Sequence, residues 1–590
     1  MTTPMRPAIW KRVRRARVEL DLDGGGTSSS IPQRMGAHTS APGNGTPGAS
    51  AVAHEERDWK SERVGVPPQG RGPGFHSESR WAHLPPHQGL APWTQEGQAP
   101  HHVPANLDSP REGVMRVDET TPAARPVGPL NGPLHVPLVG RPLRLTRFFS
   151  DPVRSLLRIR ERYGTLSAIQ QGDASRVFAF SPELNRELLA STDRFYVRAL
   201  AESAPKTSAL YRLRTHLLGL NGNAHRRARQ IVGSAFTRPR VEGYRKDMAE
   251  LADKLFERWR PGEVIDVERE MQQLALWVVS HTVYGVSPTD ANLGLGLRIK
   301  QIIQRQFSPV AMLLPQDLPG SPYRTLLRMA EDVEQGLLAL IAKKRNQSGE
   351  QRDALAALVH ARGEDGAPFT DEELVGHTFL LFFGGYDTTA NALGWTLLLL
   401  ALHPRVLHDV QDELTVLQGA APTHEQLAAL PLLDAVVKES MRLLSPVAFT
   451  ARTAARGATL GGHAIPERAE VFMSPLVTHR LPELYERPNS FLPERWLKGE
   501  QPSPWAYLPF GAGPHVCVGA TLAALEIRLT LAMLLQRFTL LPPDGARIDH
   551  QVQATLSTKA GMPMRVLSRQ RVASPPRIEG DIRELFEAPA

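Results

Sequence analysis

A single cysteine lies in a glycine-rich stretch of the sequence. Cys517 belongs to FGAGPHVCVG, which begins at Phe510 and holds Gly511, Gly513 and Gly519. Glycine permits positive φ and close approach, so this stretch can form a turn that lies flat against a large planar group. Backbone N–H groups and the N-terminus of the next amphipathic stretch would stabilise a thiolate. The pattern indicates a metal-binding sulfur, although a lone cysteine is more commonly an inert core residue.

Three further stretches place polar side chains at helical spacing. In KESMRLL, Glu439 and Arg442 stand three residues apart and can pair on one helix face. In NGNAHRRARQ, His225 and Arg229 stand four residues apart. GGYDTT, at residues 384–389, interrupts a long apolar stretch, and its glycines and threonines loosen a helix. Taken alone, these patterns also fit solvated surface pairs and a helix kink.

Together with the cysteine stretch, these motifs resemble the cytochrome P450 family. Residues 510–519 match its Phe-Gly-x-Gly-x-(basic)-x-Cys-x-Gly pattern, with His515 as the basic residue. The resemblance implies that Phe510, Gly513 and His515 contact a haem and that Cys517 binds its iron. The implied cofactor is heme b, iron protoporphyrin IX, with an axial thiolate. The pattern is long and mixed in residue type, so it is far more specific than a lone glycine motif.

The resemblance also assigns roles to the other stretches. Asp387 and Thr388 in GGYDTT would relay protons toward dioxygen. Four basic residues would neutralise the haem propionates: His225, Arg229, Arg452 and His515. Arginine suits this role because its guanidinium binds carboxylates in a bidentate way.

A buried cluster of charges is implied by the same resemblance. Arg495 in FLPERW would supply a third charge to the pair of Glu439 and Arg442. Buried charges persist only when they are paired, so we expect this triad to support the cysteine loop and to carry no chemistry.

The implied reaction is that of a haem-thiolate monooxygenase. One oxygen atom of O2 would be inserted into a lipophilic small molecule by hydroxylation or epoxidation. The family places an apolar pocket at residues 196–218, 382–386 and 447–450. Fatty acids, terpenoids and polyketide-like metabolites all remain open as substrates.

Electrons must reach such a haem from a second protein. One cysteine cannot hold an iron–sulfur cluster, and we expect the residues after Leu567 to be too few for a flavin domain. The resemblance implies a ferredoxin or flavodoxin with its NAD(P)H reductase, which would dock on the thiolate side of a monomer. Basic residues there could receive an acidic donor.

Two other functions compete with this interpretation. A peroxygenase or an isomerase on the same fold often departs from the acid–alcohol pair, whereas Asp387 and Thr388 are both present. A non-enzymatic haem-binding or sensor protein is the third hypothesis. Oxygen-dependent turnover separates it from an enzyme.

The composition excludes several classes of protein. The chain has 590 residues and one cysteine, which rules out a disulfide framework within the chain and any zinc or iron–sulfur site built on several thiolates. The 69 Lys+Arg against 61 Asp+Glu leave a net charge of +8, which is mild for this length. Without a long basic run, a zinc-finger pattern or an RNA-binding signature, we expect no nucleic-acid binding.

The elements that position these motifs are mainly helical. The sequence predicts a hairpin at residues 166–181, a serine-capped helix at 181–191, and helices at 323–344, 371–401 and 424–444. The predicted class is mainly α with small β-sheets (α+β), with a cytochrome P450 fold over residues 125–567. Residues 568–590 are predicted to form a short tail.

Residues 1–124 are rich in Gly, Pro and Ser and are predicted to be disordered. The arginine-rich residues 1–19 faintly resemble an organelle transit peptide, but no apolar signal segment follows them. Residues 377–402 are long enough to span a bilayer, yet Asp387 and Asn391 interrupt them. We therefore expect a buried central helix, no membrane span, and a soluble, cytoplasmic protein.

Overall fold

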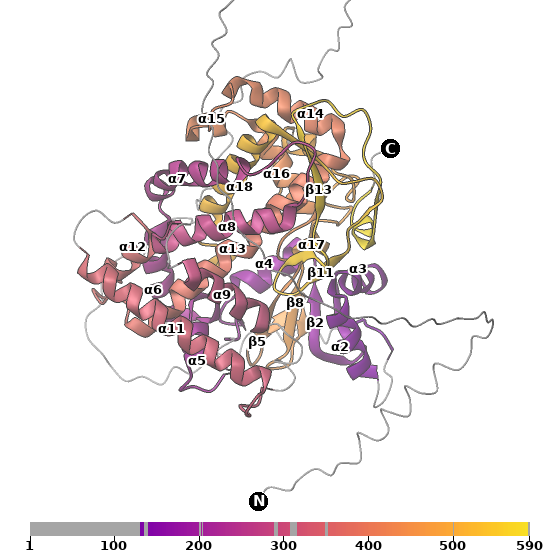
Figure 1. Cartoon of the computed structure of the whole chain (residues 1–590). Helices are drawn as coiled ribbons and strands as arrows, with labels where there is room; N and C mark the ends of the chain where they lie inside the picture. The colour runs from indigo at the N-terminus through magenta and orange to yellow at the C-terminus, as the bar shows by residue number, and fades with distance from the viewer. Residues whose placement is uncertain are drawn as a thin grey trace, which may run out of the picture. The chain divides into compact units, whose positions relative to one another are not determined.

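The computed structural model describes residues 130–134, 140–199, 202, 204–287, 293–306, 315–347, 352–498 and 501–587 (Figure 1). The predicted disordered segment at residues 1–124 and the arginine-rich residues 1–19 lie outside this described part of the chain.

Helices form most of the described residues, and small sheets accompany them, which confirms the predicted fold class. The helices are α2 Gly140–Ser150, α3 Pro152–Tyr163, α4 Pro182–Ala190, α5 Ala209–Arg214, α6 Gly222–Gly233, α7 Arg238–Phe256, α8 Val267–Tyr284, α9 Leu293–Gln306, α11 Pro322–Asn346, α12 Ala354–His360, α13 Asp371–Leu402, α14 Pro404–Glu413, α15 His424–Ala428, α16 Pro431–Leu443, α17 Pro475–Thr478 and α18 Ala520–Arg537.

The largest sheet has five strands in the order β1-β2-β8-β5-β3. Its strands are β1 Leu166–Gln170, β2 Asp173–Ala179, β3 Phe195–Tyr196, β5 Thr450–Ala454 and β8 Glu470–Met473. Strands β1 and β2 form the predicted antiparallel hairpin, and β2 runs parallel to β8. The predicted serine cap is also confirmed, because the Ser181 side chain accepts a hydrogen bond from the Leu184 N–H at the start of α4.

Smaller sheets complete the β-structure. Strands β4 Val264–Asp266, β13 Pro563–Ser568 and β9 Phe538–Leu541 form a three-stranded sheet. Three pairs of strands form the rest: β6 Thr459–Leu460 with β7 His463–Ala464, β10 Ala546–Arg547 with β14 Ile578–Glu579, and β11 His550–Val552 with β12 Leu556–Thr558.

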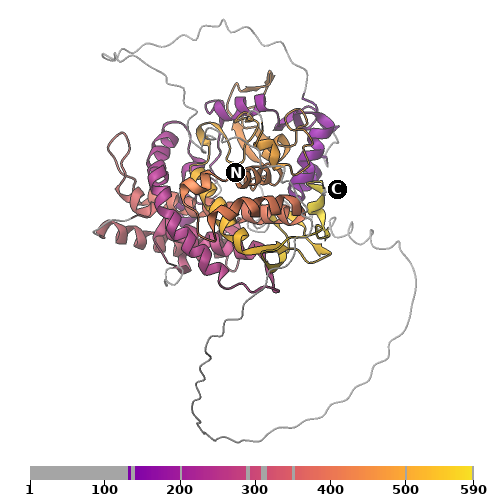
Figure 2. The ribbon, with the colours of Figure 1, turned by 90° about the horizontal axis from the view of Figure 1, so that it is seen from above.

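Helix α13 is the central element of the helical part (Figure 1, Figure 2). It packs against α5, α8, α16 and α18, and its side chains are buried on nearly every side. A capping box starts it: Thr370 Oγ1 accepts from the Glu373 N–H, and Glu373 accepts from the Thr370 N–H. None of the helices in the described part of the chain is long and apolar enough to cross a membrane.

The predicted helix at residues 424–444 is wrong as a single element. It is divided into α15 and α16, which are separated by Ala429 and Leu430. Pro431 cannot donate a backbone hydrogen bond and disfavours helical backbone in the residue before it, so it starts a new helix. The first free N–H groups of α16, at Leu432 and Leu433, donate to the Glu413 carboxylate at 2.8 and 2.9 Å.

The residues after 567, which we expected to form a tail, pack on the rest of the fold. Strand β14 pairs in parallel with β10, and Ile582 and Leu585 are buried. Arg480 donates to the Leu585 and Leu443 carbonyls at 2.6 and 2.7 Å, which joins this segment to the end of α16.

Helix α18 contains a buried carboxyl group that predicts a pH-dependent stability. Glu526 is 4% exposed, its Oε1 has no hydrogen-bond partner among the residues that the structure describes, and burial raises its pKa to about 8. The folded chain therefore keeps this proton at pH values at which the unfolded chain, with an ordinary pKa of 4.5, releases it. Because the folded state binds more protons, this group lowers the stability of the fold as pH rises from 4.5 to about 8.

Glu526→Gln should remove this effect. At pH 7 the variant should be more stable than the wild-type chain by about 3 kcal/mol, and the difference should vanish below about pH 4. Urea unfolding of both proteins across this pH range measures it. Glu331→Gln, at an exposed position of α11, is the control and should change little. A difference in unfolding free energy between Glu526→Gln and the wild-type chain that does not change with pH would contradict the raised pKa of Glu526.

Candidate functional site

The cysteine stretch forms a turn between buried elements. A short 3-10 helix, η6 Gly513–His515, precedes Cys517, and α18 starts three residues after it. The Cys517 N–H donates to the Phe510 carbonyl at 2.9 Å. Gly513 has a φ of 72°, and a Cβ there would lie 2.6 Å from the Leu189 carbonyl oxygen. Glycine is therefore required at this position for both its backbone conformation and its contact with α4.

The sulfur of Cys517 faces accessible space inside a densely packed region. Its side chain is exposed, yet desolvation by the surrounding protein raises the pKa of the thiol. The Gly519 N–H and the charge of Arg229 lower that pKa and offset the burial in part. A thiolate here therefore needs a further positive charge, which a bound metal cation supplies.

Four basic side chains meet beside this turn. His225 and Arg229 extend from α6, Arg452 from β5, and His515 from η6. The rings of His225 and His515 lie 3.9 Å apart, and Arg229 donates to the Val516 carbonyl at 2.7 Å. The structure thus brings together the four residues that the sequence analysis assigned to the haem propionates.

These basic groups lack an anionic partner within the described residues. Arg452 is 8% exposed and donates only to Ala451 O and Thr450 Oγ1, while the buried Nε2 of His225 has no hydrogen-bond partner. Burial and then the neighbouring cations lower the pKa of His225 to about 4 and of His515 to about 3, and burial lowers that of Arg452 to about 10. Buried donors of this kind require an anion. Together with the sulfur, they fit a planar cofactor that carries a metal and two carboxylates, as haem does.

The polar interruption of α13 opens the helix on one side. Gly384 is exposed in the middle of this buried helix, and a Cβ on it would meet no atom within 4 Å. The Thr388 hydroxyl donates to the Gly384 carbonyl at 2.5 Å and is itself partly accessible. The hydroxyl therefore lies next to free space and not in packed core.

Asp387 lies in a buried polar group. Its Oδ2 accepts from the Thr555 hydroxyl at 2.5 Å, and Thr555 accepts from the Asn391 amide at 2.9 Å. Burial raises the pKa of Asp387, while the Thr555 hydrogen bond and the charge of Lys300 lower it in part. Burial likewise raises the pKa of Glu268 on α8, to which Asp387 adds a smaller contribution. A carboxyl group in this position can hold a proton at a higher pH than an exposed one and can pass it on.

The expected apolar lining by residues 382–386 needs correction. Phe382 and Tyr386 are buried, and Phe382 stacks on Tyr284 of α8 at 5.8 Å. The Tyr386 hydroxyl donates to Gln272, also on α8, at 3.3 Å. Residues four positions apart in a helix lie on nearly the same side, so Phe382 and Tyr386 both face α8. Gly384, between them, is exposed.

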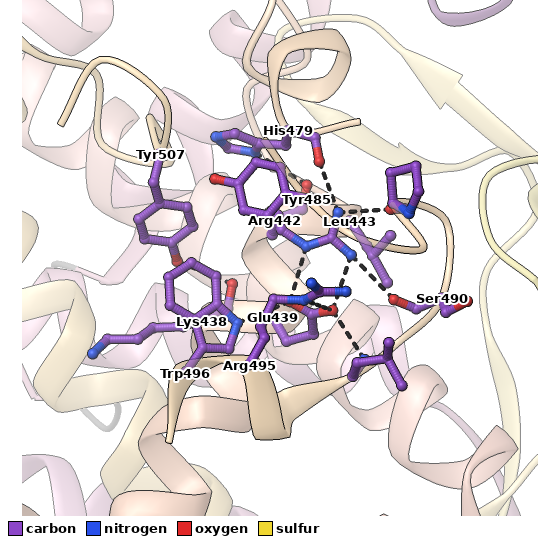
Figure 3. A network of polar contacts seen from close by, with 12 residues as sticks. Lys438, Glu439, Arg442, Leu443, His479, Tyr485, Ser490, Arg495, Trp496 and Tyr507 are labelled. Atoms are coloured by element: carbon purple, nitrogen blue, oxygen red, sulfur yellow. Dashed lines mark hydrogen bonds and ion pairs between the residues drawn. The ribbon is translucent and has the colours of Figure 1, made fainter. Parts of the chain in front are cut away.

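Figure 3 shows a charge cluster around Glu439, which lies on α16. Arg442 donates to both Glu439 oxygens at 2.9 Å, and Arg495 donates to Oε1 at 3.1 Å. The Trp496 indole and the Leu492 N–H add two more donors at 2.8 and 2.9 Å. Despite strong burial, the cations therefore keep the pKa of Glu439 below its usual value.

Every nitrogen of the Arg442 guanidinium also donates hydrogen bonds within the chain. Its guanidinium donates to the carbonyls of His479 and Pro488 at 2.7 Å and of Ser490 at 3.1 Å. The Glu439 and Arg442 side chains are both 0% exposed. Because none of their hydrogen-bonding groups points to free space, the cluster can act as a framework but not as a reactive site.

Sequence reasoning missed several members of these groups. Lys300, Glu268 and Thr555 belong to no motif and reach Asp387 only through the fold. Trp496 directly follows Arg495 in the sequence, and this adjacency was a usable signal. Within the described residues, no group of three or more His, Cys, Asp or Glu side chains could hold a metal ion by itself.

Known proteins resemble this chain over the same region. The sequence model of the family Cytochrome P450 matches residues 130–563. A cyclooctat-9-en-7-ol 5-monooxygenase from Streptomyces melanosporofaciens is 28% identical over 447 residues, which cover 74% of this chain and 95% of that protein. A pentalenene oxygenase from Streptomyces avermitilis is 29% identical over 451 residues, 74% of this chain and 96% of that protein.

Solved structures agree in fold. Retinoic acid bound cyanobacterial CYP120A1 aligns with a TM-score of 0.65 at 24% identity and covers 75% of this chain and 99% of that structure. At this level of identity the likeness concerns the fold alone.

The charge cluster predicts a large effect of a small substitution. Glu439→Gln should lower the free energy of unfolding by about 3–5 kcal/mol, because it leaves two arginines without their buried counter-charge. Denaturant unfolding of the purified protein measures this loss. Glu242→Gln is the matched control, since Glu242 pairs with Arg238 at 3.0 Å on the exposed surface of α7 and should cost less than about 1 kcal/mol. Equal effects of the two variants would contradict the framework role.

Proposed function

Given that this chain belongs to the cytochrome P450 family of monooxygenases, we propose that it binds heme b through Cys517 and oxidises a lipophilic small molecule with electrons from a separate redox protein. One observation carries the proposal. The turn carries a desolvated sulfur, and basic groups from α6, β5 and η6 meet beside it without an anion from the described residues; a haem with its iron and propionates would supply what both lack.

The proposed cofactor contacts form two groups: residues of the cysteine turn, and basic residues beside it that would bind the propionates. Cys517 would bind the haem iron, and Phe510 and Gly513 form the turn that carries it. His225, Arg452 and His515 bind the propionates. Arg229 has a double role, because its bond to the Val516 carbonyl holds the turn while its charge favours the thiolate. When bound, the haem activates O2 so that one oxygen atom enters a carbon–hydrogen bond or a double bond of the substrate.

Asp387 and Thr388 are the proposed proton-handling groups. Burial raises the pKa of Asp387, so its carboxyl holds a proton at a higher pH than an exposed aspartate does, and Thr555 fixes one of its oxygens. The Thr388 hydroxyl, anchored on the Gly384 carbonyl, can rotate to accept and donate a proton in the free space beside it. The two groups together deliver protons from the interior of the protein while the apolar side chains of α13 exclude bulk water.

For the substrate we propose a hydrocarbon-like molecule of the terpenoid class. The named relatives from Streptomyces oxidise such compounds, as their names state. For the electron donor we propose a ferredoxin or flavodoxin with an NAD(P)H reductase, which acts on a monomeric, cytoplasmic enzyme. The sequence supports an external donor because its one cysteine cannot form an iron–sulfur centre.

The difference spectrum of the reduced, carbon monoxide-bound protein tests the haem assignment. The wild-type protein should give the band typical of thiolate ligation, and Cys517→Ala should lose it. The chain has no second cysteine, so a thiolate band can be assigned to Cys517 without ambiguity. A wild-type protein that binds no haem, or a thiolate band that survives Cys517→Ala, would overturn the proposal.

Thr388→Ala tests the proton-handling role. The variant should keep its haem but form about tenfold less product per NADH and release the missing electrons as hydrogen peroxide. NADH consumption, product and peroxide are measured together, with a surrogate ferredoxin and reductase and a terpenoid that shifts the haem spin state. Thr388→Ser retains the hydroxyl and should stay close to wild type. Unchanged coupling in Thr388→Ala would exclude the hydroxyl from proton transfer.

A further inference from the structure

His479 lies between the charge cluster at Glu439 and the segment that leads into the cysteine turn. It follows α17 and is 0% exposed. Both ring nitrogens meet backbone groups: Nε2 accepts from the Leu508 N–H at 2.8 Å, and Nδ1 lies 3.1 Å from the Arg442 carbonyl. An N–H can only donate and a carbonyl can only accept. The ring must therefore be neutral, with its hydrogen on Nδ1.

The electrostatic environment of His479 supports this neutral state. Burial, followed by the charges of Arg442 and Arg480, lowers its pKa to about 3. The ring also packs against Tyr507 at 5.4 Å and Tyr485 at 6.4 Å, so aromatic neighbours cover its faces (Figure 3).

On one side, His479 is tied twice to Arg442. The Arg442 guanidinium donates to the His479 carbonyl at 2.7 Å, while the His479 ring donates to the Arg442 carbonyl. These two bonds run in opposite directions between the same residues. Since Glu439 holds the same guanidinium, the position of the His479 ring follows the position of the buried charges.

On the other side, His479 holds the entrance to the turn. Leu508 is buried, and its carbonyl accepts from the Gly511 N–H at 3.0 Å. The next bond in the chain joins the Phe510 carbonyl to the Cys517 N–H at 2.9 Å. A continuous path of hydrogen bonds therefore leads from Glu439 through Arg442 and His479 to the backbone of the proposed iron ligand.

We propose that His479 is a positioning residue: its Nε2, by accepting from Leu508, fixes the cysteine turn on the charge cluster and thereby sets the place of the Cys517 sulfur. This inference rests on the proposed function, because it takes Cys517 as the haem ligand. Partners that orient a metal ligand without touching the metal commonly change metal affinity by about 10–100-fold.

Two amide substitutions separate the two ring nitrogens. In His479→Gln the longer side chain brings a carbonyl oxygen to the position of Nε2 and keeps the acceptor for Leu508. In His479→Asn the shorter side chain brings its amide to the position of Nδ1, so it keeps the donor to Arg442 and leaves the Leu508 N–H unpaired. His479→Phe removes both bonds but retains the aromatic packing on Tyr507.

The full-length holoprotein of each variant is examined by the reduced carbon monoxide spectrum, haem retention and hydrogen exchange. We expect His479→Gln to keep the thiolate-type band. His479→Asn and His479→Phe should lose haem about tenfold more readily, shift much of the band to the form without thiolate, and exchange the Leu508 and Gly511 amides faster. The ratio of the two bands does not depend on the amount of protein in the sample, and the hydrogen exchange of the other buried amides shows whether the rest of the fold is intact.

Several outcomes would overturn the proposal. A His479→Asn protein with wild-type spectrum and exchange would exclude the Leu508 bond, and a normal His479→Phe would show that packing alone suffices. A His479→Asn protein that yields no folded chain would make His479 a residue for folding and not for ligand position. If the wild-type protein gives no thiolate band, the proposed function fails, whereas the exchange of Leu508 and Gly511 still reports on the bond to His479.

Discussion

The buried carboxylate of Glu439 constrains much of the structure around it. A charge without access to water must be matched by donors, and its two oxygens receive hydrogen bonds from Arg442, Arg495, Trp496 and the Leu492 N–H. These donors come from α16 and from a segment some fifty residues later in the chain, so both must take one fixed relative position. The hydrogen bonds of His479 with Arg442 and Leu508 then connect the cysteine turn to this cluster, so the turn is held in the same arrangement.

The framework and the site differ in how their charges are balanced. Glu439 and Arg442 are satisfied entirely by the chain, and so they need no ligand. The pKa values of His225 and His515 are lowered to about 4 and about 3, so both rings are neutral near pH 7, and Arg452 pairs with no carboxylate within the described residues. In the proposed function a cofactor with carboxylates supplies the partners that these groups lack, and its binding would stabilise the fold.

The sequence predicted the parts of this structure whose information is local. The cysteine turn, the hairpin of β1 and β2, and the central helix α13 each follow from residue types at short spacing. The division between α15 and α16 was missed, although Pro431 is a local signal for it. Lys300, Thr555 and His479 could not be found, because they act through residues that only the fold brings near: Thr555 contacts Asp387 168 positions away, and His479 contacts Arg442 and Leu508 37 and 29 positions away. The stretch at residues 382–386 was expected to line a pocket without a choice of side; Phe382 and Tyr386 face α8, which the apolar pattern, nearly continuous around this helix, could not indicate.

The nearly continuous apolar surface of α13 also explains the chemistry proposed for this helix. A helix that is apolar on all sides is stable in the centre of the fold, but it leaves a carboxyl group at Asp387 with little water. Burial raises the pKa of that group, because the neutral acid costs less to bury than the carboxylate. The neutral acid is also the form that can donate a proton. The same desolvation that lets α13 form the core therefore shifts Asp387 toward the proton-donating form that the proposed reaction uses, and Gly384 leaves free space beside it.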